Sequence, residues 1–131
     1  SQLMQILFSQ STVRSSRTQI IELMPILQQT FAKYNKISML FLSDMVQESD
    51  NRNFLTRPIP GKLQAESMAE QDFEKLRTRF GLEPTIMDHV SEIQILVPTG
   101  TDQNMLSTTP YYFSKFFTLF GFKGQLEWDG A

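Results

Sequence analysis

Two groups of polar residues follow short apolar segments of the chain, where binding and catalytic side chains are often found. Ser43 and Asp44 come at the end of the apolar segment 37–43, and a Thr-Gly-Thr-Asp stretch ending at Asp102 follows the apolar segment 92–97. In open α/β sheets, ligands bind beyond the carboxyl ends of the strands. We therefore expect Ser43, Asp44 and Asp102 to lie at the ligand-binding edge of a sheet.

A third polar group lies in the serine-rich loop 9–18, directly before an amphipathic segment. Ser16 and Thr18 are suited to cap a helix, because their hydroxyl oxygens can accept hydrogen bonds from its first free N–H groups. Arg14 and Arg17 in the same loop could hold an anion, which the dipole of the following helix would also favour. Ser16 joins the candidate ligand-edge residues if the fold brings this loop to the same edge.

Composition narrows the class of protein. The net charge is −2 with basic residues scattered along the chain, so nothing indicates a nucleic-acid partner. The absence of cysteine excludes disulfides, thiolate metal sites and cysteine nucleophiles, and fits the cytoplasm. No apolar run approaches the roughly 20 residues that span a bilayer. We therefore expect a cytoplasmic protein without a membrane span. Among the charged and titratable residues, we expect His89 to lie at the surface, and Asp72 and Glu74 to form an exposed pair on a helix.

Apolar periodicity predicts alternating helices and strands. Apolar residues recur at three- and four-residue steps over 19–34, which predicts a helix. Pro25 must either kink this helix or lie in the first turn of one that starts late. The segment 37–43 is apolar on both faces, which is typical of a buried central parallel strand. The remaining predicted elements are a helix over 64–80 that stops at Gly81, a short helix over 83–90, a strand over 92–97, a helix over 111–120 and a strand over 125–128. The phenylalanines of the helix over 111–120 cover more than half of its circumference, so we expect this helix to be heavily buried.

This alternation predicts a mainly parallel sheet with helices on its faces. With 131 residues, the chain is long enough for one good core and too short for two. We expect one α/β domain over residues 1–131, with a three-layer α/β/α arrangement and a Rossmann-like sheet. Residues 2–8 are too few to assign by period, and they are either a strand or the end of a helix.

The segment Phe41–Asp50, followed by Asn53 and Phe54, resembles the third metal-loop region of a group of bacterial von Willebrand factor A-like proteins. Those proteins carry a strand, then Ser-Asp-Met, then a loop that ends near Asn-Phe. Residues 16–21 resemble their second loop, whose threonine leads into a helix. Similarity to the closing strand, helix and final strand is found at residues 92–97, 112–117, 121 and 127–128. The resemblance covers most of this chain and corresponds to the C-terminal half of such a domain.

The resemblance implies a metal site. In that family a divalent ion, usually Mg²⁺, is bound at a metal-ion-dependent adhesion site by an Asp-x-Ser-x-Ser loop, a second-loop threonine and a third-loop aspartate, oxygen ligands that suit a hard cation. Thr18 would be the second-loop ligand and Asp44 the third. Because this chain contains no Asp-x-Ser-x-Ser sequence, we expect a partial site, with Mg²⁺ bound only in a complete parent domain and not by this chain alone.

Two functions follow from these patterns. The first is a non-enzymatic von Willebrand factor A-like interaction module that binds a protein partner or self-associates through an open sheet edge. The second is a phosphate- or nucleotide-handling flavodoxin-like enzyme that uses the loop 9–18 and Asp44, with Asp102 near the reacting group. A strand at residues 2–8, with the serine-rich loop beside Asp44, would favour the enzyme. A helix there would favour the truncated A-like domain.

Overall fold

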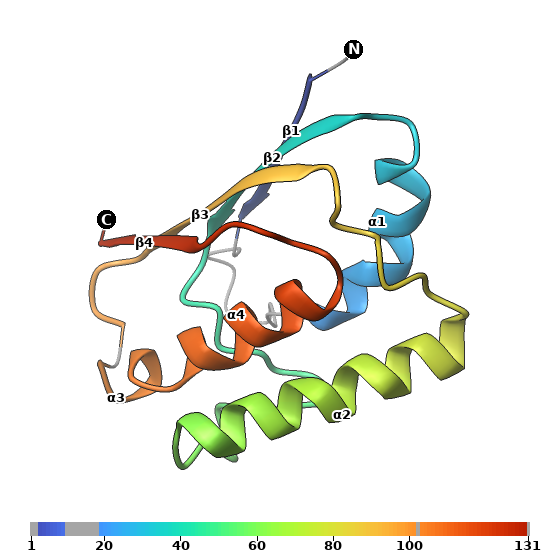
Figure 1. Ribbon diagram of the computed structural model, residues 1–131. Coiled ribbons are helices and arrows are strands. Elements are labelled where there is room, and N and C mark those ends of the chain that lie inside the picture. The colour runs from blue at the N-terminus through green and yellow to red at the C-terminus, as the bar shows by residue number, and fades with distance from the viewer. Residues whose placement is uncertain (1–2, 10–18, 102, 131) are drawn as a thin grey trace.

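The computed structural model describes residues 3–9, 19–101 and 103–130, and Figure 1 shows how their helices and strands are arranged. Strands and helices alternate along the chain, as the apolar periodicity predicts. The elements are β1 (Leu3–Ser9), the 3-10 helix η1 (Ile21–Leu23), α1 (Met24–Phe31), β2 (Lys36–Leu42), α2 (Lys62–Phe80), β3 (Val90–Val97), α3 (Gln103–Leu106), α4 (Thr109–Leu119) and β4 (Leu126–Gly130).

The four strands form one parallel sheet in the order β1-β2-β3-β4. This confirms the prediction of a parallel α/β protein. Residues 2–8, which the sequence left open between strand and helix, contribute β1, whose last residue Ser9 is in register with Leu42. The carboxyl ends of β1 and β2 therefore lie side by side.

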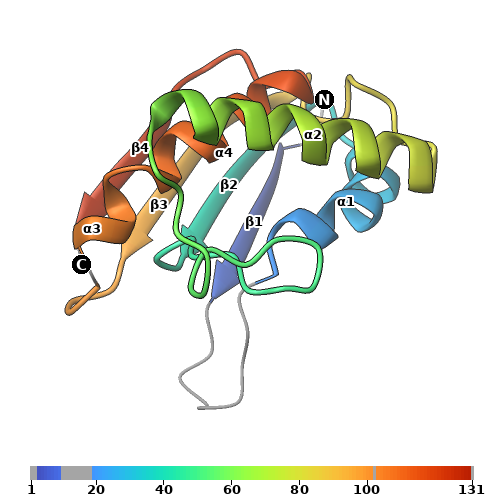
Figure 2. The ribbon, with the colours of Figure 1, turned by 90° about the horizontal axis from the view of Figure 1, so that it is seen from below.

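Every helix in the described part of the chain lies on the same face of the sheet (Figures 1 and 2). Parallel strands are joined by crossovers of one hand. Because each new strand is added on the same side of the previous one, every crossover falls on the same face. The expectation of helices on both faces is therefore wrong for the described residues. The layers run instead from the sheet to α4 and then to α2.

Strand β2 shows the consequence of this arrangement. Ile37, Met39 and Phe41 point to the helices and are at most 1% exposed. Leu40 and Leu42 alternate with them and are half-buried on the other face. The prediction of a central strand is confirmed, because β2 lies between β1 and β3, but within the described structure only one of its faces is fully buried.

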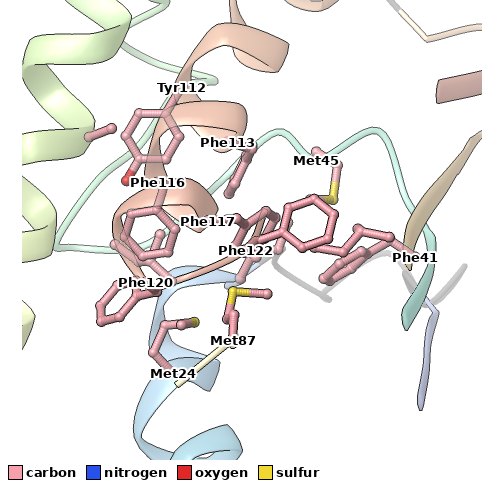
Figure 3. Packing of buried hydrophobic residues seen from close by; sticks show 14 of the residues in the cluster. Met24, Phe41, Met45, Met87, Tyr112, Phe113, Phe116, Phe117, Phe120 and Phe122 are labelled. Atoms are coloured by element: carbon pink, nitrogen blue, oxygen red, sulfur yellow. The ribbon is translucent and has the colours of Figure 1, made fainter. Parts of the chain in front are cut away.

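An aromatic cluster fills the space between the sheet and the helices (Figure 3). Phe117 of α4 stacks on Phe41 of β2, and the ring of Phe120, just after α4, meets that of Phe73 in α2 edge to face. Helix α4 thus contacts the sheet on one side and α2 on the other. The predicted heavy burial of this phenylalanine-rich helix is confirmed: Tyr112, Phe113, Phe116, Phe117 and Phe120 are all fully buried.

Two local predictions have different outcomes. Pro25 lies in the first turn of α1, so the late start is confirmed and the kink is not needed. The short helix predicted over 83–90 is wrong, because residues 84–89 form turns. There the N–H of Met87 donates to the carbonyl of Phe120 at 2.8 Å, and the N–H of Asp88 closes an i, i+3 turn on Thr85. Pairing with the end of α4 takes the backbone groups that a helix would need.

Candidate functional site

The carboxyl end of β2 is a tight turn held by its own side chains. The N–H of Ser43 donates to the carbonyl of Leu96 in β3 at 3.1 Å, which anchors the turn to the sheet. The Ser43 hydroxyl oxygen accepts a hydrogen bond from the N–H of Met45, and Asp44 Oδ1 accepts one from the N–H of Val46, both at 2.9 Å. Each side chain therefore caps the backbone two residues further on, as serine and aspartate commonly do in turns.

Met45 has a backbone conformation that is unusual for its residue type. Its φ is 61°, in the left-handed region, where residues other than glycine are uncommon. Such a conformation costs on the order of 1–3 kcal/mol. Its side chain is fully buried in the core beside the rings of α4 (Figure 3), and burial of a methionine contributes roughly 1.5–3 kcal/mol. Core packing thus offsets the strain and fixes the direction of the chain after the strand.

Gln47 connects this turn to the start of η1. Its Oε1 accepts hydrogen bonds from the N–H groups of Ile20 at 2.7 Å and Ile21 at 3.1 Å. Its Nε2 donates to Glu22 Oε1 at 2.7 Å and to the Ser49 hydroxyl at 3.0 Å. The side chain is fully buried, so these bonds satisfy an amide that would otherwise be costly to bury. Gln47 therefore caps this helical segment from a distant loop.

The carboxylate of Glu22 is the acceptor at the centre of this network. Besides the bond from Gln47, its Oε2 accepts hydrogen bonds from the Ser49 hydroxyl at 2.6 Å and from Asn51 Nδ2 at 2.9 Å. The Ser49 N–H donates in turn to the carbonyl of Arg52 at 3.0 Å. Three donors from one loop hold this carboxylate, so its geometry serves to fix the loop against η1.

A second buried polar cluster lies deeper, where the loop after β2 meets α2 and α4. Arg52 donates to Asp72 from both Nε (2.9 Å) and Nη2 (2.8 Å), a bidentate pair. The Tyr112 hydroxyl donates to Asp72 Oδ2 at 2.6 Å. Asp72 is 3% exposed and so belongs to the core, and its interpretation as part of an exposed pair with Glu74 is wrong.

This cluster shifts the pKa values of two of its members. Burial raises the pKa of Tyr112 well above its ordinary value of 10.0, and the adjacent Asp72 carboxylate raises it further. The hydrogen bond to Asp72 raises the pKa of Arg52 above its ordinary value. Both shifts favour the protonated forms, so the cluster keeps a neutral phenol and a charged guanidinium around one carboxylate.

Two cavities are relevant to ligand binding. The larger, about 600 Å³, lies between α2, η1 and the loop 50–51, with Asp72, Lys75 and Arg79 among its lining residues. The other, about 380 Å³, lies at the carboxyl ends of β3 and β4 and is lined by Thr99, Thr101, Trp128 and Asp129 among others. No lysine or arginine belongs to the described lining of this second cavity.

The structure places the predicted site residues as follows. Ser43 and Asp44 follow β2 and Thr99–Thr101 follow β3, so both groups lie at the carboxyl edge of the parallel sheet. Asp44 does not belong to the described lining of the cavity beside Thr99 and Asp129. Ser16, Thr18 and Asp102 lie outside the residues that the structure describes, so the partial metal site at Thr18 and Asp44 stays a prediction. Within residues 3–9, 19–101 and 103–130, no group of three or more His, Asp or Glu side chains could hold a metal ion.

His89 is exposed, as predicted, and its Nδ1 lies 3.0 Å from the carbonyl oxygen of Tyr34.

Sequence reasoning missed both polar clusters, the one around Glu22 and Gln47 and the one around Asp72. Gln47 carries no local signal of its capping role, because Ile20, Ile21 and Glu22 are 25 to 27 residues away from it. Asp72 does carry one, since it falls on the buried stripe of α2 that includes Ala69, Phe73 and Leu76.

One face of the sheet carries no described helix (Figures 1 and 2), which the sequence did not predict. We call it the helix-free face. It is formed by the residues of β2, β3 and β4 that alternate with the core residues: Ser38, Leu40, Leu42, Glu92, Gln94, Leu96, Glu127 and Asp129. Two side-chain hydrogen bonds cross it, from Ser38 to Glu92 at 3.5 Å and from Gln94 Nε2 to Glu127 at 3.3 Å.

Comparison with known proteins identifies no relative: no family model, no curated protein and no solved structure matches the chain. Among the described helices, none has the length and apolar character needed to cross a membrane.

Proposed function

We propose that this chain is a non-enzymatic protein-interaction module that binds its partner through the helix-free face. The observation that carries the proposal is the parallel sheet whose described helices all lie on one side (Figure 1). All-parallel sheets occur almost only where both faces are covered. Three leucines of this face are only half-buried, and a bound partner would cover them: Leu40, Leu42 and Leu96.

The polar groups of the described structure support a binding role over catalysis. Ser43 and Asp44 close a turn, Gln47 and Glu22 fix a loop, and Asp72 pairs with Arg52 and Tyr112. Each of these groups makes hydrogen bonds that either fix a local turn or hold two parts of the chain together. The resemblance to von Willebrand factor A-like proteins adds the expectation of protein binding, with a degenerate metal site at Thr18 and Asp44.

Site-specific photocrosslinking in cells of the source organism tests this proposal. A photoreactive phenylalanine is placed at Leu42 on the helix-free face and, in a matched control, at Leu63, which is 77% exposed on α2. We expect Leu42 to crosslink one defined protein that Leu63 does not. That protein, once purified, should bind the chain and lose binding to a folded Leu40→Asp variant. Equal crosslinking from both positions, or unchanged binding by the variant, would overturn the proposal.

A second candidate is a phosphate- or nucleotide-handling enzyme of flavodoxin-like type. The observation in its favour is that residues 3–9 form a strand whose last residue pairs beside the end of β2, so the serine-rich loop starts at the carboxyl edge. Calorimetric titration with inorganic phosphate and with ADP tests it. Binding that weakens in an Arg14→Ala, Arg17→Ala double variant would support the enzyme, and absence of heat with both ligands would remove it.

A further inference from the structure

We infer that the partner presents an amphipathic helix with an apolar stripe and with lysine or arginine residues on the side that faces β4. This inference rests on the proposed function and specifies its partner. It follows from three properties of the helix-free face: the position of its leucines, the sign and position of its charges, and the width of the apolar strip.

The leucines of the face form a short row between β2 and β3. Leu42 is in register with Leu96 on the neighbouring strand, and Leu40 precedes Leu42 by one alternation. Neighbouring strands lie about 4.8 Å apart, whereas a helix with its side chains is about 10 Å wide. One helix therefore covers the two strands that carry the row. The seven residues of β2 extend over roughly 23 Å, which a helix of about 15 residues spans.

Two carboxylates of the face lie beside the leucine row on β4, and a third lies on β3. Glu127 and Asp129 of β4 are in register with Gln94 and Leu96, so both belong to the helix-free face. Glu92 adds a third carboxylate from β3. The only basic residue in β2, β3 and β4 is Lys36, at the opposite end of β2. An approaching surface thus meets leucines over β2 and at Leu96 of β3, and carboxylates over β4 and at Glu92 of β3.

This asymmetry selects among the possible occupants. A second copy placed face to face would bring three carboxylates of each chain into the contact against a single lysine, and like charges in a contact are unfavourable. An acidic helix would meet the same repulsion. A helix with basic residues beside its apolar stripe would place positive charges along the carboxylates of β4. The apolar stripe of the same helix would bury the leucines. Charge complementarity of this kind gives orientation as well as attraction.

Two synthetic 15-residue helical peptides test the inference. Both carry the same leucine stripe, with lysine in one and glutamate in the other at the flanking positions. We expect the leucine–lysine peptide to bind and to shift the amide NMR signals of β2, β3 and β4, and the leucine–glutamate peptide to bind at least about tenfold more weakly, which corresponds to about 1.4 kcal/mol.

Two charge-reversal variants locate the effect. Glu127→Lys with Asp129→Lys should weaken the leucine–lysine peptide about tenfold. Glu70→Lys with Glu74→Lys makes the same change of charge on exposed positions of α2 and should leave its affinity nearly unchanged. Equal loss in both double variants, equal affinity of the two peptides, absence of binding, or self-association through this face would each overturn the inference.

These outcomes separate the inference from the proposed function. If both peptides bind equally and both are lost in a folded Leu40→Asp variant, the helix-free face is an interaction surface and only its charge preference is refuted. If the crosslinking experiment at Leu42 fails while the leucine–lysine peptide binds as expected, the face recognises basic helices and the protein partner is refuted.

Discussion

The two faces of the sheet are made from the same strands and have opposite surroundings. On the helix side, Met39 and Phe41 of β2 are at most 1% exposed, and Phe41 stacks on Phe117 of α4 (Figure 3). On the helix-free side, Leu40 and Leu42 of the same strand are only half-buried. The residues are similar in size and apolar character, so the difference comes from the topology. The order β1-β2-β3-β4 sends every described helix to one side.

The polar residues of the two faces differ in the same way. On the helix side, Asp72 is buried and accepts hydrogen bonds from Arg52 and Tyr112. On the helix-free side, Glu127 and Asp129 are exposed to solvent. A buried carboxylate is costly unless its hydrogen-bond partners are in place, whereas an exposed carboxylate is accessible to charged groups of another molecule. The first kind of charge therefore stabilises the fold, and we propose that the second kind selects what binds to it.

The largest expected effect comes from the helix side. Phe116 of α4 is fully buried and its ring lies against those of Tyr112, Phe113, Phe117 and Phe120. Phe116→Ala should lower the free energy of unfolding by about 4 kcal/mol, because it removes the ring and leaves a cavity. Urea denaturation followed by circular dichroism measures this. A loss below about 1.5 kcal/mol would show that the aromatic cluster is not the rigid core described above.

The second largest loss of stability should come from removing the buried carboxylate of Asp72. Asp72→Ala leaves the Arg52 guanidinium half-buried without its bidentate partner and the Tyr112 hydroxyl without its acceptor. Removing one partner of a buried ion pair costs about 3–5 kcal/mol, and we expect the lower end because Arg52 keeps some access to water. Glu74→Ala is the matched control on the same helix, where the side chain is 67% exposed. It should change stability by less than about 0.5 kcal/mol.

The phenol of Tyr112 should make stability depend on pH. Its pKa in the folded protein is raised above the ordinary value of 10.0. Below that value the phenol is protonated in both states, and its hydrogen bond to Asp72 contributes fully. As the pH rises above 10, the unfolded chain loses this proton while the folded chain keeps it, so the free energy of unfolding falls towards the folded pKa.

Tyr112→Phe sharpens this prediction. The variant should lose about 2 kcal/mol at neutral pH, the contribution of a hydrogen bond to a charged acceptor. Its free energy of unfolding should fall less steeply above pH 10 than that of the unmodified protein, by up to about 1.4 kcal/mol per pH unit. Parallel pH profiles for the two proteins would show that Tyr112 does not titrate in the manner described.

Sequence patterns predicted the elements well because those patterns are local. The phenylalanines of α4 cover more than half of its circumference and so predicted its burial, and Gly81 ends α2 in the left-handed conformation that a helix stop favours. The coverage of the sheet was not predictable in this way. It depends on strand order, which is a relation between segments that local periodicity does not encode.

The candidate site was predicted less well, for a related reason. The position of Ser43 and Asp44 at the end of a strand was predictable, because an apolar segment followed by polar residues marks such an end. The long-range partners of Gln47 and Arg52 lie 20 to 27 residues away and approach only in the folded chain. General burial preferences predict an exposed Asp72, because aspartate is seldom fully buried, although its place on the apolar stripe of α2 points to the core.

The smallest expected effect in the free chain belongs to the helix-free face, and it tests the comparison most directly. Leu40→Ala removes a half-buried side chain and should cost about 1 kcal/mol, part of what full burial of a leucine contributes. Met39→Ala changes the adjacent residue, which points to the helices and is 1% exposed, and should cost about 3 kcal/mol. Both are measured by urea denaturation of the isolated chain. If the two losses were equal, Leu40 would already be covered within the chain, and the helix-free face would have no area to offer a partner.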